Sequence, residues 1–285
     1  MRLYANHYPQ RGAESEGWLT RPELEKQALD DIKQLHATCP KYRFEEPSQK
    51  NVIERFAVEV VDLRATYESG ITGKARIVDG PEPMSVEQYA RGYFQSIGFK
   101  VILSESRPLH VLFGAFLWLL VQEPTDPKIR IVGIADRNRS AVGNTRPAWF
   151  LLPEDFGTPG YGERRRSDID DYFVNVVPHT TEDLLWAFDY WLECSQRLRQ
   201  YLWAEEIDAV SAARQILEVL PPQVVRRILR YLVDSYWTNF CGWPDLLVWR
   251  GSEFFFVEVK SSHDKLSEDQ KHWISENHAR LMLPF

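Results

Sequence analysis

The sequence predicts an α/β protein in which a mixed sheet is flanked by helices. Two apolar runs near the C-terminus, Leu246–Trp249 and Phe254–Val259, are separated by a glycine-containing spacer, which is the pattern of a β-hairpin. A further run, Phe99–Leu103, has strand character, and Leu109–Leu120 is apolar on every face, as buried helices are. Strands and a buried helix in one region indicate a sheet covered by helices.

The N-terminal residues 1–84 are predicted to be mostly helical, and no role is assigned to them. Pro22–Thr38 has apolar residues at helical spacing and ends at a Cys-Pro pair. Val52–Tyr67 is predicted as a second helix.

Two S-x-x-Q patterns predict helices that begin with a capping box. Ser85 and Gln88 begin a helix that Gly98 closes, directly before the first predicted strand. Ser267 and Gln270 begin the last helix, directly after the hairpin.

A helical insertion is predicted at about 122–220. Prolines interrupt its first half, and Gly157–Gly162 is predicted to be a loop. Thr181–Trp203 and Ile207–Val219 have the spacing of long helices. After the last helix, Ala279–Leu283 is predicted as a short strand.

The composition limits the classes of protein. The chain has 285 residues, enough for one large domain or two small ones, and its ten Trp allow a sizeable core. A formal net charge of −7 argues against uniform DNA-binding charge but permits a local basic groove. The three cysteines are far apart, which favours a reducing cytoplasm. Because the N-terminus has no apolar signal core and Val111–Val121 is too short to span a bilayer, no membrane partner is expected.

The hairpin brings a small group of charged residues together. Asp245 precedes its first strand, and Glu258 and Lys260 end its second. Because side chains alternate along a strand, Glu258 and Lys260 face the same side, where Asp245 can join them. Two carboxylates offer the oxygen ligands that Mg²⁺ prefers. An ammonium beside them can orient a nucleophile or stabilise charge that develops on phosphorus.

The same residues also have an ordinary structural interpretation, because Pro-Asp is a common turn and E-x-K is a common edge-strand pattern. The second strand, however, is apolar on both faces, as buried strands are. Glu258 and Lys260 at its end are costly unless they are paired or bind a metal. This cost favours the functional interpretation.

Three motifs follow one another in the last part of the chain. They are G-W-P-D-L at 242–246, E-V-K at 258–260 and the segment Asp264–Trp273. Their order resembles the VRR-NUC domain of the PD-(D/E)xK nuclease superfamily. The resemblance implies a restriction-endonuclease-like fold and a metal-dependent DNA phosphodiesterase, with the acidic pair and the lysine of the hairpin in its active site.

An upstream glutamate also resembles a family position. In the Fanconi-associated nuclease branch a Glu precedes a segment that ends in Gly and Trp, and Glu105, Gly114 and Trp118 have this spacing. Residues 85–285 are therefore treated as one nuclease-like domain that contains the insertion. A carboxylate before a buried helix is also a common partner of the helix dipole.

The implied active site has oxygen ligands only. The resemblance assigns one or two Mg²⁺ or Mn²⁺ ions to Glu105, Asp245 and Glu258, and the backbone carbonyl of Val259 is a further candidate ligand. Gln270 follows the catalytic strand closely in sequence. It is either an active-site hydrogen-bonding residue or no more than a capping residue.

Two groups of arginines are candidates for contacts with DNA phosphates. Arg226, Arg227 and Arg230 lie on the polar side of the helix that begins at Pro222, and Arg164–Arg166 follow the glycine loop. Both groups also fit an ordinary solvated surface.

The predicted reaction is metal-assisted hydrolysis of DNA, with branched or flapped DNA as the preferred substrate in repair or recombination. Relatives that consist of this domain alone resemble junction resolvases, which act as dimers, so a homodimer is a further expectation. Two alternatives stay open. One is a restriction-like defence nuclease, and the other is a DNA-binding scaffold protein whose nuclease site is idle.

Overall fold

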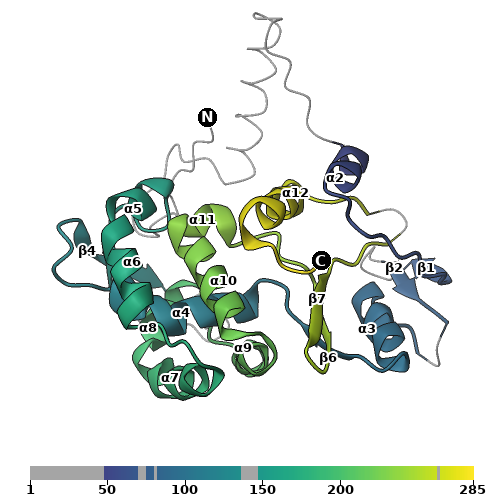
Figure 1. The fold of residues 1–285 in the computed structure, drawn as a ribbon, viewed down its shortest axis with the longest axis horizontal. Coiled ribbons are helices and arrows are strands. Elements are labelled where there is room, and N and C mark those ends of the chain that lie inside the picture. Colours follow the sequence, from purple (N-terminus) through teal and green to yellow (C-terminus); the bar gives the residue numbers. More distant parts are fainter. Residues whose placement is uncertain (1–47, 70–74, 80–81, 136–146, 262–263) are drawn as a thin grey trace, which may run out of the picture.

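Three short sheets and a larger set of helices make up the part of the chain that the computed structural model describes, residues 48–69, 75–79, 82–135, 147–261 and 264–285 (Figure 1). The strands are β1 (Tyr67–Ser69), β2 (Ala75–Ile77), β3 (Lys100–Leu103), β4 (Ile129–Ala135), β5 (Pro147–Pro153), β6 (Leu246–Arg250) and β7 (Glu253–Val257). The helices are α2 (Gln49–Arg55), α3 (Val86–Ser96), α4 (Arg107–Val121), α5 (Pro159–Arg164), α6 (Arg166–Asn175), α7 (Thr181–Cys194), α8 (Gln196–Tyr201), α9 (Ile207–Val219), α10 (Pro222–Asp234), α11 (Tyr236–Asn239), α12 (Glu268–Glu276) and the π-helical turn η2 (Asn277–Leu281).

The predicted hairpin is confirmed as β6 and β7, and β3 pairs with β6 to complete a sheet in the order β3-β6-β7. Both pairings are antiparallel, whereas a mixed sheet was predicted. Leu103 at the end of β3 lies opposite Leu246 at the start of β6, so these two strands run in opposite directions. The register also pairs Leu246 with Val257, so Asp245 and Glu258 extend from neighbouring strand ends.

Helices cover both faces of this sheet, as the α/β prediction requires. Helix α3 begins at the predicted capping box of Ser85 and Gln88, and it buries Ala90 against the sheet. In Figure 1 the hairpin of β6 and β7 lies between α3 on one side and α10 to α12 on the other. Helix α4 is buried along almost its whole length and packs against α7, α8, α9 and α10, which explains its lack of a polar face.

The insertion is not helical throughout. It begins with the antiparallel pair of β4 and β5, and helices follow from α5 onward. The loop predicted at Gly157–Gly162 is wrong, because Thr158 caps α5 and Pro159 occupies its first position. The helix predicted at Thr181–Trp203 is two helices that meet at Ser195.

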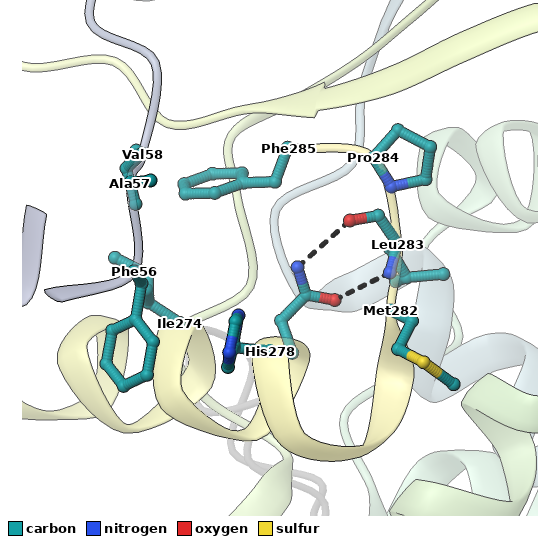
Figure 2. A pocket seen from close by; sticks show the side chains of 10 residues that line it. Phe56, Ala57, Val58, Ile274, His278, Met282, Leu283, Pro284 and Phe285 are labelled. Atoms are coloured by element: carbon teal, nitrogen blue, oxygen red, sulfur yellow. Dashed lines mark hydrogen bonds between the residues drawn. The ribbon is translucent and has the colours of Figure 1, made fainter.

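The two ends of the described chain also differ from prediction. Helix α2 begins at Gln49 and ends at Arg55, so most of the helix predicted at Val52–Tyr67 is absent, and Pro22–Thr38 lies outside the described residues. The strand predicted at Ala279–Leu283 is wrong. The Asn277 side chain bonds both the N–H and the carbonyl of Leu283, which closes the turn there (Figure 2). Among the described helices, none has the length and hydropathy to cross a membrane.

Candidate active site

The structure brings Asp245, Glu258 and Lys260 together at the ends of β6 and β7. The Lys260 ammonium lies 2.7 Å from Oε1 of Glu258. The backbone N–H of Val259 donates to Oδ2 of Asp245 at 2.7 Å, so the segment after β7 is fastened to the residue before β6.

Neighbouring backbone fixes where Asp245 points. The N–H of Ser104 donates to the Asp245 carbonyl at 2.8 Å, and its hydroxyl donates to the Pro244 carbonyl at 3.0 Å. On the other side, Gly242 has a φ of +81°, and a Cβ there would lie 2.2 Å from the Asp269 carbonyl oxygen. The glycine therefore lets the turn before β6 lie directly against the start of α12.

Glu258 has the most perturbed carboxyl group of the site. Its side chain is only 7% exposed, and this burial, with the nearby Asp245 carboxylate, raises its pKa from 4.5 to about 8 despite the opposing effect of Lys260. Burial also raises the pKa of Asp245; the Val259 N–H opposes this rise and Glu105 adds to it. Two buried acids that face each other lower their repulsion by keeping a proton or by binding a cation.

The side chain of Gln270 makes two hydrogen bonds, one within the capping box and one to Glu258. Its Oε1 accepts from the Ser267 N–H at 2.9 Å, which completes the capping box of α12. Its Nε2 donates to Oε1 of Glu258 in a short hydrogen bond. Helix α12 therefore holds the carboxylate that follows β7.

Glu105 lies in the turn between β3 and α4. The Arg107 N–H bonds the Glu105 carbonyl across Ser106, whose φ of +42° and ψ of −57° are those of a classic γ-turn. Such a conformation is strained for serine by about 1–3 kcal/mol. The Glu105 side chain is exposed, and it is near enough to Asp245 for its charge to raise the pKa of that carboxyl.

Glu87 was not predicted, yet its charge also raises the pKa of Asp245. It lies in the first turn of α3, which packs on β6. In the sequence, an acidic residue in the first turn of a capped helix is explained fully by the helix dipole. The sequence therefore offers no reason to choose Glu87 as a site residue.

The carboxylate oxygens of Glu258 and Asp245 are the candidate ligands for a hard divalent cation. Oε1 of Glu258 receives both Lys260 and Gln270, whereas Oε2 is buried and accepts no hydrogen bond from the described residues. This buried oxygen without a donor, in a carboxyl group close to Asp245, is suited to a cation. Across the described ranges, no three Asp, Glu, His or Cys side chains are yet grouped closely enough to hold a metal ion. The fit therefore rests on Glu258 and Asp245, with Glu105 and Glu87 farther out.

Most of the arginines predicted to contact DNA are bound inside the protein, so they do not form the free basic surface that was expected. Arg164 pairs with Asp126 and Asp155, and Arg165 is buried against Asp126. Arg166 is exposed at the start of α6.

The arginines of α10 are half-buried, and two of them have partners within the protein. Arg226 donates to the carbonyls of Phe173, Val177 and Pro178. Arg230 pairs with Asp170 and Asp234, and Nε of Arg227 is buried. The sequence could not show these partners, because each lies in another helix or loop or at the end of α10.

A hollow of about 530 Å³ lies at the C-terminal end of α12 (Figure 2). Gln270 is near the other end of that helix. Phe56, Ile274, His278 and Phe285 are among the walls of the hollow, and no carboxylate side chain lines it. It therefore lacks the ligands that the carboxylate pair provides.

The part of the chain that contains this site is similar to a known domain. The model of the VRR-NUC domain matches residues 181–280, which include the whole hairpin and α12. Residues 181–280 of this chain are thus similar to the VRR-NUC domain. The match includes Asp245, Glu258, Lys260 and Gln270, so the clustered residues of the structure fall inside the matched region.

Related proteins extend the similarity beyond that domain. The Fanconi-associated nuclease 1 homolog of Arabidopsis thaliana is 26% identical over 250 residues, which cover 84% of this chain and 26% of that protein. Fanconi-associated nuclease 1 of Homo sapiens is 26% identical over 196 residues, which cover 67% of this chain and 18% of that protein. The chain thus spans about a quarter or less of the length of these relatives.

A solved structure supports the fold. A crystal structure of paFAN1 bound to 2nt 5′ flap DNA with gap matches with a TM-score of 0.50 at 17% identity, over 92% of this chain and 46% of that chain. The predicted α/β nuclease fold is therefore confirmed.

Proposed function

We propose that this chain is a metal-dependent DNA phosphodiesterase that cleaves branched or flapped DNA in repair or recombination. The observation that carries the proposal is the difference in surroundings between the two carboxylate oxygens of Glu258. One of its oxygens is held by Lys260 and Gln270, and the other is buried without a hydrogen-bond donor among the described residues, while the nearby Asp245 carboxylate raises the pKa of the group. A purely structural ion pair would have satisfied both oxygens.

Asp245 and Glu258 would hold Mg²⁺ or Mn²⁺, with Glu105 and the Val259 carbonyl as further candidate ligands. When bound, such an ion lowers the pKa of water and offsets charge on phosphorus. Glu258 has to give up its proton for this, and because its pKa is raised to about 8, metal binding should strengthen as pH rises toward that value. Lys260 lies beside the carboxylate with its ammonium, where it orients the attacking oxygen or stabilises developing negative charge.

The choice of substrate rests on the relatives. The similar proteins are named Fanconi-associated nucleases, and the matching crystal structure holds 5′ flap DNA. A flapped or branched substrate is therefore the leading candidate for this chain. A homodimer and a cytoplasmic location are part of the same proposal, and sedimentation of the purified protein tests the first of them.

The test is cleavage of linear duplex, 5′ flap and four-way DNA of matched sequence with Mg²⁺ or Mn²⁺. Wild-type protein should cut flap or four-way DNA fastest, and Asp245→Asn and Lys260→Ala should each slow cleavage by about 10²-fold or more. The exposed Lys265→Ala is the matched lysine control and should cut as wild type does.

Other outcomes favour the alternatives. Preference for one linear sequence would indicate a restriction-like nuclease. Binding of DNA without cleavage in either metal, and without any loss of binding in Asp245→Asn, would indicate a scaffold with an idle site.

A further inference from the structure

Helix α7 carries a stacked pair of aromatic side chains at the surface, far in sequence from the carboxylate site. Trp186 and Tyr190 are each 64% exposed. Their rings lie 5.2 Å apart and are nearly parallel, with an interplanar angle of 6°. Within the described residues, no other aromatic residue is more than half exposed.

The remainder of this helix face is acidic. Neighbours on a helix are three or four residues apart, so carboxylates at those spacings surround the two rings. The exposed acidic residues of α7 are Glu182, Asp183, Asp189 and Glu193. The helix contains no Lys or Arg. We call the two aromatic and four acidic residues the α7 face.

A guanidinium already binds at the edge of this face. Arg214 of α9 donates from Nε to Asp189 at 3.1 Å, and it also pairs with Glu218. This contact offsets one of the four carboxylates and leaves both aromatic rings exposed. The other three carboxylates, Glu182, Asp183 and Glu193, form no ion pair with another described residue. A cationic partner would offset their charge and cover the rings.

We propose that the α7 face is the docking site for an arginine-rich segment of a partner protein. A guanidinium stacks on the face of Trp or Tyr while its N–H groups bind a neighbouring carboxylate in a bidentate pair. Stacked aromatic rings also suit unpaired DNA bases, but four carboxylates around the rings repel the phosphates that accompany any base. The charge of the face therefore favours a basic polypeptide over nucleic acid.

The test is fluorescence anisotropy of short labelled peptides of alternating Arg and Ser, with Lys and Glu versions, against the whole chain. The Arg peptide should bind more tightly than the Lys peptide, and the Glu peptide should not bind. The double variant Trp186→Ala with Tyr190→Ala should weaken binding of the Arg peptide roughly tenfold. Glu182→Gln with Glu193→Gln should weaken it and reduce its dependence on salt.

Two controls separate this face from other surfaces. Val174→Ala removes an equally exposed apolar side chain from α6 and should leave peptide binding unchanged. Asp245→Asn should also leave it unchanged, because the peptide does not occupy the nuclease site. All substituted residues on the α7 face are exposed, so circular dichroism should show an unchanged fold. Equal peptide binding by the aromatic double variant and wild type would overturn the proposal. Weakened binding of single-stranded DNA by that variant, with peptide binding intact, would assign the rings to bases instead.

Discussion

At the scale of single residues, the two oxygens of Glu258 have different surroundings. Oε1 receives the Lys260 ammonium and the Gln270 amide, whereas Oε2 is buried without a donor. The raised pKa of Glu258 follows from this burial and from the facing Asp245 carboxylate. The protein thus keeps a carboxyl group whose charged form is unfavourable.

The free energy of unfolding should therefore depend on pH through Glu258. The folded-state pKa of about 8 exceeds the ordinary value of 4.5, so the folded protein binds more protons between these values. Stability is then lost as pH rises through that window. Without metal, Glu258→Gln should be more stable than wild type above pH 8, by about 1–2 kcal/mol or roughly 3–6 °C in Tm.

Thermal melts at several pH values check this expectation. At pH values below 4.5 the two proteins should melt at similar temperatures, because Glu258 is then protonated in both states of wild type. Added Mn²⁺ should raise the Tm of wild type more than that of Glu258→Gln. Equal melts of both proteins across the whole range would contradict the buried, raised-pKa carboxyl.

A second residue-scale prediction separates the two roles of Gln270. Gln270→Glu keeps the acceptor that caps α12 but replaces the N–H donor to Glu258 with a further carboxylate. DNA cleavage should fall by about tenfold or more, since one charge-assisted hydrogen bond contributes roughly 1.5–3 kcal/mol. Gln88→Glu is the matched control, because Gln88 has the same position in the capping box of α3. If both variants cut DNA as wild type does, Gln270 is a capping residue only.

At the scale of elements, the site depends on how the turn before β6 packs against α12. Gly242 approaches the Asp269 carbonyl and the Gln270 N–H, while Ser104 at the end of β3 holds Pro244 and Asp245. Three elements that are remote in sequence therefore set the position of one carboxylate.

Gly242→Ala should push the turn before β6 away from α12, in addition to straining the backbone at residue 242 itself. The added Cβ would meet backbone at 2.2 Å, so the turn and α12 must separate. We expect a loss of about 2–4 kcal/mol in the free energy of unfolding and a large loss of cleavage. Gly251→Ala is the control, since its φ of +61° is equally left-handed but its Cβ meets open space. It should lose only about 1 kcal/mol and keep its activity, as urea melts and cleavage rates would show. Equal effects of both substitutions would argue against the packing explanation.

At the scale of the whole molecule, the proposed binding of DNA requires a local group of basic residues, because the chain as a whole is acidic. The net charge is −7, and Arg164, Arg165, Arg226 and Arg230 are engaged within the protein. Arg91 on α3 and Lys100 on β3 are exposed, and no ion pair joins either to another described residue. They lie on elements that pack beside β6, so they replace the α10 arginines as candidates for phosphate contacts.

Salt dependence of DNA binding distinguishes the two groups. Arg91→Gln with Lys100→Gln should flatten the plot of log affinity against log salt by roughly 0.9 per contact. Arg226→Gln should leave that slope unchanged and lower the free energy of unfolding by about 1–3 kcal/mol, because three carbonyls lose their donor. A flatter slope in Arg226→Gln alone would restore α10 as the DNA-binding helix.

The sequence by itself determined the features that depend on local pattern. Alternation and a glycine spacer predicted the hairpin, and S-x-x-Q predicted the start of α12. Strand alternation also predicted that Glu258 and Lys260 face the same side, and their side chains are paired at 2.7 Å although both residues lie beyond β7, which ends at Val257. Each of these features depends on residues that are close together in the sequence, so a local pattern is enough to predict it.

Only the tertiary structure decided which charges are free and which are bound. Arg226 and Arg164 resemble surface arginines in the sequence, and their partners come from other helices and loops. Glu87 resembles an ordinary first-turn acid until α3 packs on β6 and brings it near Asp245. A side chain's charge is fixed by its residue type, but its electrostatic partners are set by long-range packing, which a local pattern does not encode.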